Sequence, residues 1–226
     1  MIPDRATLTT EYTLQYMGCV PAASRLAEID RTIAAILANK ARYEKVAMKL
    51  PNPPWFVIAL IHMRESDLNF RCHLHNGDPL TARTHHVPAG RPSSGQPPFT
   101  WEESAWDALH FDHVDKEPFT SVMDICYALE AYNGWGYRDH HTPDPYLWAA
   151  SNQYHSGKFI ADGVFSVAAS DQQLGCITVF KRMVERNVIT APGKAGEVGK
   201  VISGEVINAA EPPAATKNQA PGTKNA

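Results

Sequence analysis

The most constraining feature of the sequence is an apolar run, Trp55–Met63, which follows Pro53 and Pro54 and leads directly into Arg64-Glu65-Ser66-Asp67. A helix that is apolar on every side has no face for water and belongs at the centre of a domain. The run is about half as long as the ~18 apolar residues that mark a membrane span, and it contains His62. It therefore predicts a buried core helix, with Glu65 emerging at the C-terminal end of that helix.

Helical patterns account for most of the remaining core. Apolar residues fall three or four apart between residues 22 and 50, which indicates an amphipathic helix. Capping-box patterns at Thr100–Glu103 and Ser170–Gln173 predict the starts of two later helices, around 105–109 and through 177–183. A further helix is expected to begin at Thr120 and to end at Asn133-Gly134.

Residues 68–99 interrupt this helical pattern. They are rich in Pro and Gly and include a β-prone stretch at 80–87, which predicts a small β-hairpin or an irregular flap. The predicted fold class is therefore α+β and predominantly α-helical, in one domain over residues 1–203 with its core at about 22–186. Residues 204–226, mostly Ala, Pro, Lys, Asn and Thr, are expected to form a disordered tail.

The composition argues against several classes of protein. The chain has 226 residues and a formal net charge of -3, without the basic clusters typical of nucleic-acid-binding proteins. Residues 1–7 contain no apolar segment of the kind found in signal peptides, which predicts accumulation in the cytoplasm. The four cysteines form no C-x-x-C pattern, so neither a zinc knuckle nor a thioredoxin-like redox motif is indicated.

Glu65 is the first candidate for chemistry. A carboxyl group half buried against apolar walls has its charged form disfavoured, and the C-terminal end of a helix acts in the same direction, so we expect a raised pKa. Such an acid still carries its proton near neutral pH and can protonate the leaving oxygen of a glycosidic bond. The alternative is a structural glutamate that pairs with a neighbour such as Arg64.

Two short motifs belong together: the apolar helix ending in Glu65-Ser66, and the later Ala131-Tyr132-Asn133-Gly134. In this combination, with the glycine of the second motif one position early, the sequence resembles the lysozyme-like superfamily, in particular the soluble lytic transglycosylases and goose-type lysozymes. The resemblance implies cleavage of the β-1,4 bond between N-acetylmuramic acid and N-acetylglucosamine in peptidoglycan. It also implies that Glu65 is the acid, that Tyr132 orients or hydrogen-bonds it, and that Asn133 shapes the cleft. Ser66 is expected to contact substrate or to stabilise the turn.

The segment after Glu65 departs from that family. A Gly-Leu-Met-Gln-like segment that lines the cleft floor in transglycosylases is replaced by residues 73–80, where His75 and Asn76 are expected to contact substrate instead. Asp78 matches an aspartate in the flap of goose-type lysozymes and is a candidate for positioning water. The alternatives are that Asp78 serves only as a turn residue, or that groups of the substrate complete the reaction as in a transglycosylase.

Aromatic side chains cluster in the second half of the chain. Trp135 and Tyr137 lie in a Gly-flanked loop next to Tyr132-Asn133, and Trp148 precedes a polar stretch. Because sugar rings stack on aromatic faces, these three residues are predicted to bind the glycan.

The histidines suggest a rival function. His73 and His75, with the adjacent His85 and His86 and with Asp78, could hold zinc in an amidase or peptidase that acts on wall peptides. Because no third ligand has diagnostic spacing, we expect neither a metal nor another cofactor. Two further rivals are a non-catalytic glycan-binding or structural protein and a chitinase-like enzyme.

The resemblance also suggests a route to the substrate. The sequence looks like phage or prophage proteins that lyse the cell wall, which implies peptidoglycan as the partner and no stable membrane insertion. Export would then depend on a holin, on a secretion apparatus, or on incorporation into a virion.

Overall fold

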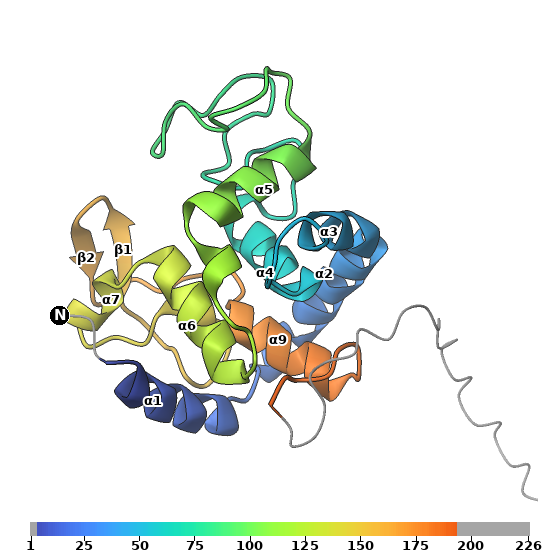
Figure 1. Cartoon of the computed structure of the whole chain (residues 1–226). Coiled ribbons are helices and arrows are strands. Elements are labelled where there is room, and N and C mark those ends of the chain that lie inside the picture. Colours follow the sequence, from blue (N-terminus) through green and yellow to red (C-terminus); the bar gives the residue numbers. More distant parts are fainter. Residues whose placement is uncertain (1–3, 194–226) are drawn as a thin grey trace, which may run out of the picture.

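Helices make up about half of the residues in the structure, a computed structural model that describes residues 4–193 (Figure 1). The predicted tail at 204–226 and the last predicted residues of the domain lie outside the described residues. The elements are α1 (Arg5–Gly18), η1 (Ala23–Arg25), α2 (Leu26–Ala38), α3 (Lys40–Ala47), α4 (Trp55–Ser66), α5 (Trp101–Phe111), η2 (Val114–Lys116), α6 (Val122–Asn133), α7 (Gly136–Asp139), α8 (Pro145–Trp148), β1 (Lys158–Ala161), β2 (Val164–Ser166) and α9 (Cys176–Glu185). About half of the described residues are helical and two short strands form one small sheet, which agrees with the predicted α+β class.

Helix α4 forms the centre of the core, as predicted. Every residue of Trp55–Met63 is buried, and the helix packs against α3 on one side and α9 on the other. It ends where Asp67 adopts a left-handed conformation (φ 51°) and its N–H donates to the carbonyl group of His62. In the part of the chain that the structure describes, none of the helices is long and apolar enough to cross a membrane.

The single helix predicted between residues 22 and 50 is divided into three pieces. A short η1 turn precedes α2, and Asn39 separates α2 from α3. The Asn39 side chain donates to the carbonyl group of Ala35, a local bond that competes with helix continuation. The buried stripe resumes at Tyr43, seven residues after Ile36, so the hydrophobic spacing alone did not reveal the break.

Two of the predicted helix starts need correction. Thr100 and Glu103 do form a capping box at the start of α5, but Ser121, not Thr120, caps α6. The Ser170–Gln173 pattern does not open a helix, because α9 begins at Cys176 with Gly175 as its N-cap. Asp171, inside that pattern, instead forms an ion pair with Arg64 at the end of α4.

The strands lie outside the Pro- and Gly-rich segment. Residues 68–99 form an irregular flap held by one isolated bridge, Cys72–Pro79, and the β-prone stretch 80–87 contains no strand. The antiparallel hairpin β1–β2 comes later, where Phe159 and Phe165 pack against Tyr137. Figure 1 shows the flap beside α5 at the top and the hairpin beside α7 at the left.

The packing of α9 against α8 depends on a glycine. A Cβ atom at Gly175 would lie 2.5 Å from the carbonyl oxygen of Leu147 and 2.6 Å from the backbone nitrogen of Ala149. We therefore expect Gly175→Ala to lower the free energy of unfolding by about 2–3 kcal/mol, measured by urea denaturation, because backbone atoms must shift. Gly18→Ala is the control, since its Cβ would meet only the flexible Gln153 side chain at 3.3 Å. Equal stability of the two variants would contradict this account of the contact.

Candidate active site

Glu65 is a half-buried acid at the last turn of α4. The hydroxyl group of Tyr146 donates a hydrogen bond to Glu65 Oε1 at 2.9 Å. Burial raises the pKa of Glu65 to about 7, against the lowering effects of the Tyr146 bond and of the Arg64 charge. Glu65 therefore retains its proton over much of the range between about pH 4.5 and 7. The upward direction of this pKa shift agrees with the prediction from the sequence.

Arg64 does not neutralise its neighbour. Its guanidinium group binds the Asp171 carboxylate at 2.8 Å and lies over the Tyr146 ring, 4.9 Å from the ring centroid. Both partners of this ion pair are buried, with side chains 7% and 3% exposed. The positive charge next to Glu65 is thus committed elsewhere, and the alternative in which Glu65 pairs with Arg64 is wrong.

Tyr146 makes the hydrogen bond to Glu65 that the family resemblance implied for Tyr132. The Tyr132 hydroxyl group donates to the carbonyl oxygen of Leu74 at 3.2 Å, while its ring lies 6.5 Å from that of Tyr146. Burial, and then the charge of Glu65, raise the pKa of Tyr132. Tyr132 is therefore near the acid without bonding to it. Tyr146 carried no motif of its own, because it lies in a four-residue helix behind a linker.

Asp112 is a second carboxyl group that the sequence did not single out. It follows α5, and its charge adds to the effects that raise the pKa of Glu65 and of Tyr132. Burial raises the pKa of Asp112 itself, and nearby Arg91 opposes that effect. Asp112 is exposed, and its carboxylate forms no hydrogen bond or ion pair with another of the described residues. It is therefore available to a ligand.

Asp78 is committed to the flap. Its Oδ2 atom accepts hydrogen bonds from the backbone N–H groups of His85 and His86, and its Oδ1 atom bonds to His86 Nδ1 at 2.6 Å. Burial alone would raise the pKa of Asp78, but these bonds outweigh it and hold the pKa well below the usual range. Asn76 supports the same loop, since its amide donates to the carbonyl oxygen of His86. The geometry gives both residues a structural task.

The histidines that suggested zinc are engaged with protein groups. His73 bonds to Ser104 Oγ and to the carbonyl oxygen of Ala82, both at 2.8 Å. His75 is buried and bonds to Asp107 at 2.8 Å, and burial lowers its pKa to about 4. Among the described residues no group of three or more His, Cys, Asp or Glu side chains is arranged to hold a metal ion.

The remaining predicted substrate contacts are distributed over several places. Asn133 donates to both oxygens of Asp144, the residue that caps α8, and so links α6 to α8. Ser66 is half buried, and its hydroxyl group has no hydrogen-bond partner in the described part of the chain. It lies directly after Glu65, and the hydroxyl oxygen itself is buried.

The three predicted sugar-stacking residues are mainly packing residues. Trp135 contacts the Tyr127 ring, with centroids 5.3 Å apart, and Tyr137 supports the hairpin through Phe159 at 5.1 Å. Trp148 is 1% exposed and lines a separate cavity.

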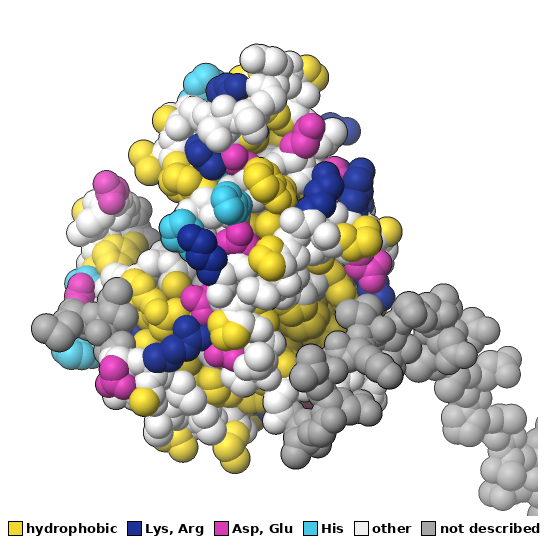
Figure 2. Space-filling view, in the orientation of Figure 1, with side chains coloured by type: hydrophobic (Ala, Val, Ile, Leu, Met, Phe, Trp, Pro, Cys, Tyr) yellow, Lys and Arg dark blue, Asp and Glu magenta, His cyan; other side chains and the backbone are white. Residues whose placement is uncertain are grey.

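The surface is hollowed between the flap at the top and the hairpin at the left (Figure 2).

Comparisons with known proteins gave no further assignment. No family model, no curated protein and no solved structure matches the chain. The candidate site therefore rests on Glu65, Tyr146 and Asp112. A protonated carboxyl group that accepts a hydrogen bond from a tyrosine hydroxyl group can act as a general acid, and the charge of Asp112 helps to raise its pKa.

The raised pKa of Glu65 predicts a pH-dependent stability. The unfolded carboxyl group loses its proton near its ordinary pKa of 4.5, whereas the folded one keeps it up to about 7, so rising pH favours unfolding between these values. Between these pH values the wild type should therefore lose up to about 3 kcal/mol of its free energy of unfolding because of Glu65. We expect Glu65→Gln to abolish this loss, measured by urea denaturation between pH 4.5 and 8. Glu28→Gln, at an exposed ion pair with Arg25, is the control. If wild type and Glu65→Gln lose stability in parallel, the buried-acid assignment fails.

The tyrosines near Glu65 provide a matched pair of variants. Tyr146→Phe removes the hydrogen bond that lowers the pKa of Glu65, so that pKa should rise by about one unit. Tyr132→Phe removes a bond to a backbone carbonyl group and should leave the Glu65 pKa nearly unchanged. NMR titration of the Glu65 side-chain carboxyl carbon would measure both. A larger shift in Tyr132→Phe would reverse the assigned roles.

Proposed function

We propose that this protein cleaves glycan strands of peptidoglycan between N-acetylmuramic acid and N-acetylglucosamine, with Glu65 as the general acid. The observation that carries the proposal is the Glu65 carboxyl group, raised to a pKa of about 7 by burial and held by Tyr146. Glycosidic cleavage needs an acid that is still protonated near neutral pH, because the leaving oxygen must accept a proton. A lysozyme-like domain with α4 at its centre is part of the same proposal.

Asp112 is the better candidate for the second step. In a hydrolase a carboxylate activates or positions water across the sugar from the acid. Asp78 has both oxygens bound to His85 and His86, whereas Asp112 keeps its carboxylate accessible and interacts with Glu65. In a transglycosylase no water attacks, and groups of the substrate close the anhydro ring.

The rival metal-dependent amidase receives no support from the histidines. His73 and His75 would each have to give up hydrogen bonds to Ser104 or Asp107 before binding zinc. A glycan-binding protein without activity remains the rival that the same experiment separates from the enzyme.

We expect wild-type protein to release soluble muropeptides from purified peptidoglycan and Glu65→Gln to release them at least about 100-fold more slowly. Mass spectrometry of the products measures this, and reducing or 1,6-anhydro ends distinguish hydrolysis from transglycosylation. Glu28→Gln is the matched control and should retain activity. Equal release by wild type and Glu65→Gln removes Glu65 as the acid, and no release by wild type from several wall types favours the binding protein.

Asp112→Asn tests the second carboxylate. If the products carry reducing ends, this variant should slow their formation by about 10-fold or more, because activation of water is impaired. If the products carry anhydro ends, the rate should change little. A hydrolase that is insensitive to Asp112→Asn would show that another group activates the water.

A further inference from the structure

A buried ion pair lies directly beside the candidate acid. Arg64 Nη2 is 2.8 Å from Asp171 Oδ2, and the two side chains are 7% and 3% exposed. Arg64 precedes Glu65 in α4, whereas Asp171 lies in the segment that leads into α9, 107 residues further along the chain. Packing of that segment against the end of α4 therefore places a carboxylate on the cation next to Glu65.

Asp171 is itself fixed by further contacts. Its Oδ1 atom accepts a hydrogen bond from the backbone N–H group of Gln173 at 3.0 Å and lies 3.3 Å from Lys158 Nζ of β1. Burial alone would raise the pKa of Asp171, but the charge of Arg64 and the hydrogen bonds from Arg64 and Gln173 outweigh it and lower the pKa. Asp171 is therefore a fixed negative charge over the pH range in which Glu65 titrates.

The guanidinium group of Arg64 is close to the acid and is not fully bonded. It lies over the Tyr146 ring, 4.9 Å from the centroid, and the hydroxyl group of that ring donates to Glu65 Oε1 at 2.9 Å. Its Nη1 atom donates to the carbonyl oxygen of Leu174 at 3.4 Å, while its Nε atom is buried and has no hydrogen-bond partner among the described residues. Arg64 thus retains an N–H group that can donate to another carboxylate if Asp171 is lost.

Arg64 supplies a positive charge that acts on Glu65. Burial raises the pKa of Glu65, the Tyr146 hydrogen bond and the Arg64 charge oppose that rise, and the charge of Asp112 adds to it. Other titratable side chains around the end of α4 are neutral near pH 7, because burial raises the pKa of the tyrosines and the cysteine and lowers the pKa of the histidines. They are Tyr43, Tyr132, Tyr146, Cys176, His62 and His75.

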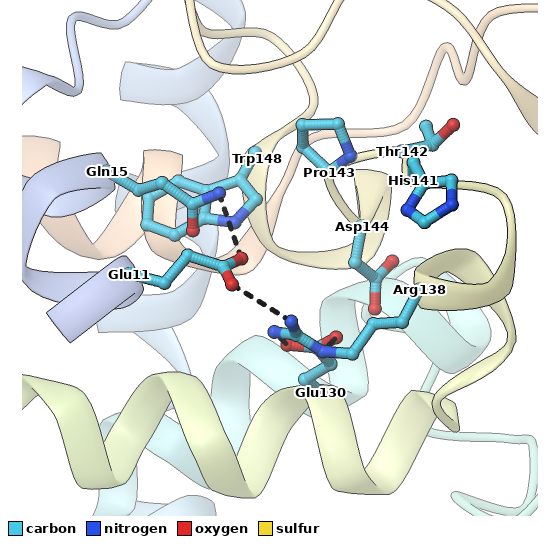
Figure 3. A pocket seen from close by; sticks show the side chains of 9 residues that line it. All are labelled: Glu11, Gln15, Glu130, Arg138, His141, Thr142, Pro143, Asp144 and Trp148. Atoms are coloured by element: carbon cyan, nitrogen blue, oxygen red, sulfur yellow. Dashed lines mark hydrogen bonds and ion pairs between the residues drawn. The ribbon is translucent and has the colours of Figure 1, made fainter. Parts of the chain in front are cut away.

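Arg64 acts on a second carboxyl group as well. Asp144 caps α8 and points into the cavity shown in Figure 3. Burial raises the pKa of Asp144 to about 7, and the charge of Arg64 is among the effects that oppose the rise. Glu65 and Asp144 are therefore the two buried acids that a released Arg64 side chain would affect.

We propose that Asp171 is a positioning residue for the candidate acid, because it holds the Arg64 guanidinium group and prevents it from pairing with the Glu65 carboxylate. A cation released next to a buried carboxyl group would favour the ionised form, and a carboxylate cannot protonate a leaving oxygen. The catalytic consequence rests on the proposed function, whereas the electrostatic effect of Asp171 on Glu65 does not.

The test is a double-mutant cycle in which the Glu65 carboxyl carbon of the full chain is titrated by NMR. Asp171→Asn should lower the pKa of Glu65 by about one unit or more, because Arg64 is released. Arg64→Met should raise it by less than about half a unit, because Asp171 already holds the charge of Arg64. In the Arg64→Met background, Asp171→Asn should have almost no further effect, since Asp171 acts through Arg64.

Lys158→Met is the matched control. It removes the other cation from Asp171, its side chain is 35% exposed, and it leaves the contact with Arg64 in place, so the pKa of Glu65 should stay as in wild type. An unchanged Glu65 pKa in Asp171→Asn, an equal fall in both backgrounds, or a fall confined to Asp144 would each overturn the proposal. If Asp171→Asn does not fold, Arg64→Met decides, because a rise of about one unit or more would show that Asp171 does not withhold the charge.

A pH profile of muropeptide release separates this inference from the proposed function. Wild type should lose activity as the pH rises through the pKa of Glu65, and Asp171→Asn should lose it at a lower pH, by the shift that NMR measures. The expected NMR shifts in a wild type that releases no muropeptides would refute the proposed function alone. Cleavage by wild type with an unchanged Glu65 pKa in Asp171→Asn would refute the role of Asp171 alone.

Discussion

The burial of α4 is the constraint on which the rest of the structure depends. Its residues Trp55–Met63 are covered on all sides, so α3 and α9 must pack against it and its direction is fixed. The chain can become polar only where the helix leaves the core, and Arg64, Glu65 and Ser66 occupy that point. The location of the candidate acid is therefore a consequence of core packing.

The short helix α8 lies between the candidate site at Glu65 and the cavity lined by Trp148. Asp144 caps it and lines the cavity, Tyr146 bonds to Glu65, and Trp148 forms the cavity wall. Four residues can hold these positions because Gly175 allows the start of α9 to touch the backbone at Leu147 and Ala149. The packing of α8 therefore positions Tyr146 toward Glu65, and Asp144 and Trp148 toward the cavity. Helix propensity alone could not hold so short a helix in place.

The sequence predicted features that depend on local chemistry. The apolar run identified α4 and Glu65, and the Thr100–Glu103 capping box identified the start of α5. It did not predict α1, whose periodicity is weak, or the hairpin, whose strands are only four and three residues long. Tyr146 and Asp112 were missed because they lie 81 and 47 residues after Glu65, and no local pattern records the hydrogen bond of the first or the electrostatic influence of the second. The local patterns at Asp78 and Trp148 also did not record their surroundings, since Asp78 is bonded to His85 and His86 and Trp148 is 1% exposed.

A comparison of two buried glutamates explains why Glu65 stands out. Glu130 is 3% exposed, but Arg138 and the Tyr12 hydroxyl group bind its carboxylate, so its charge is compensated within the fold. Glu65 forms no ion pair among the described residues, because Arg64 is held by Asp171, and its one side-chain partner is a neutral hydroxyl group. Burial without a counterion leaves the carboxyl group protonated at the expense of stability at higher pH. That difference in compensation is the physical argument on which the proposed role of Glu65 rests, whereas Glu130 is paired within the fold.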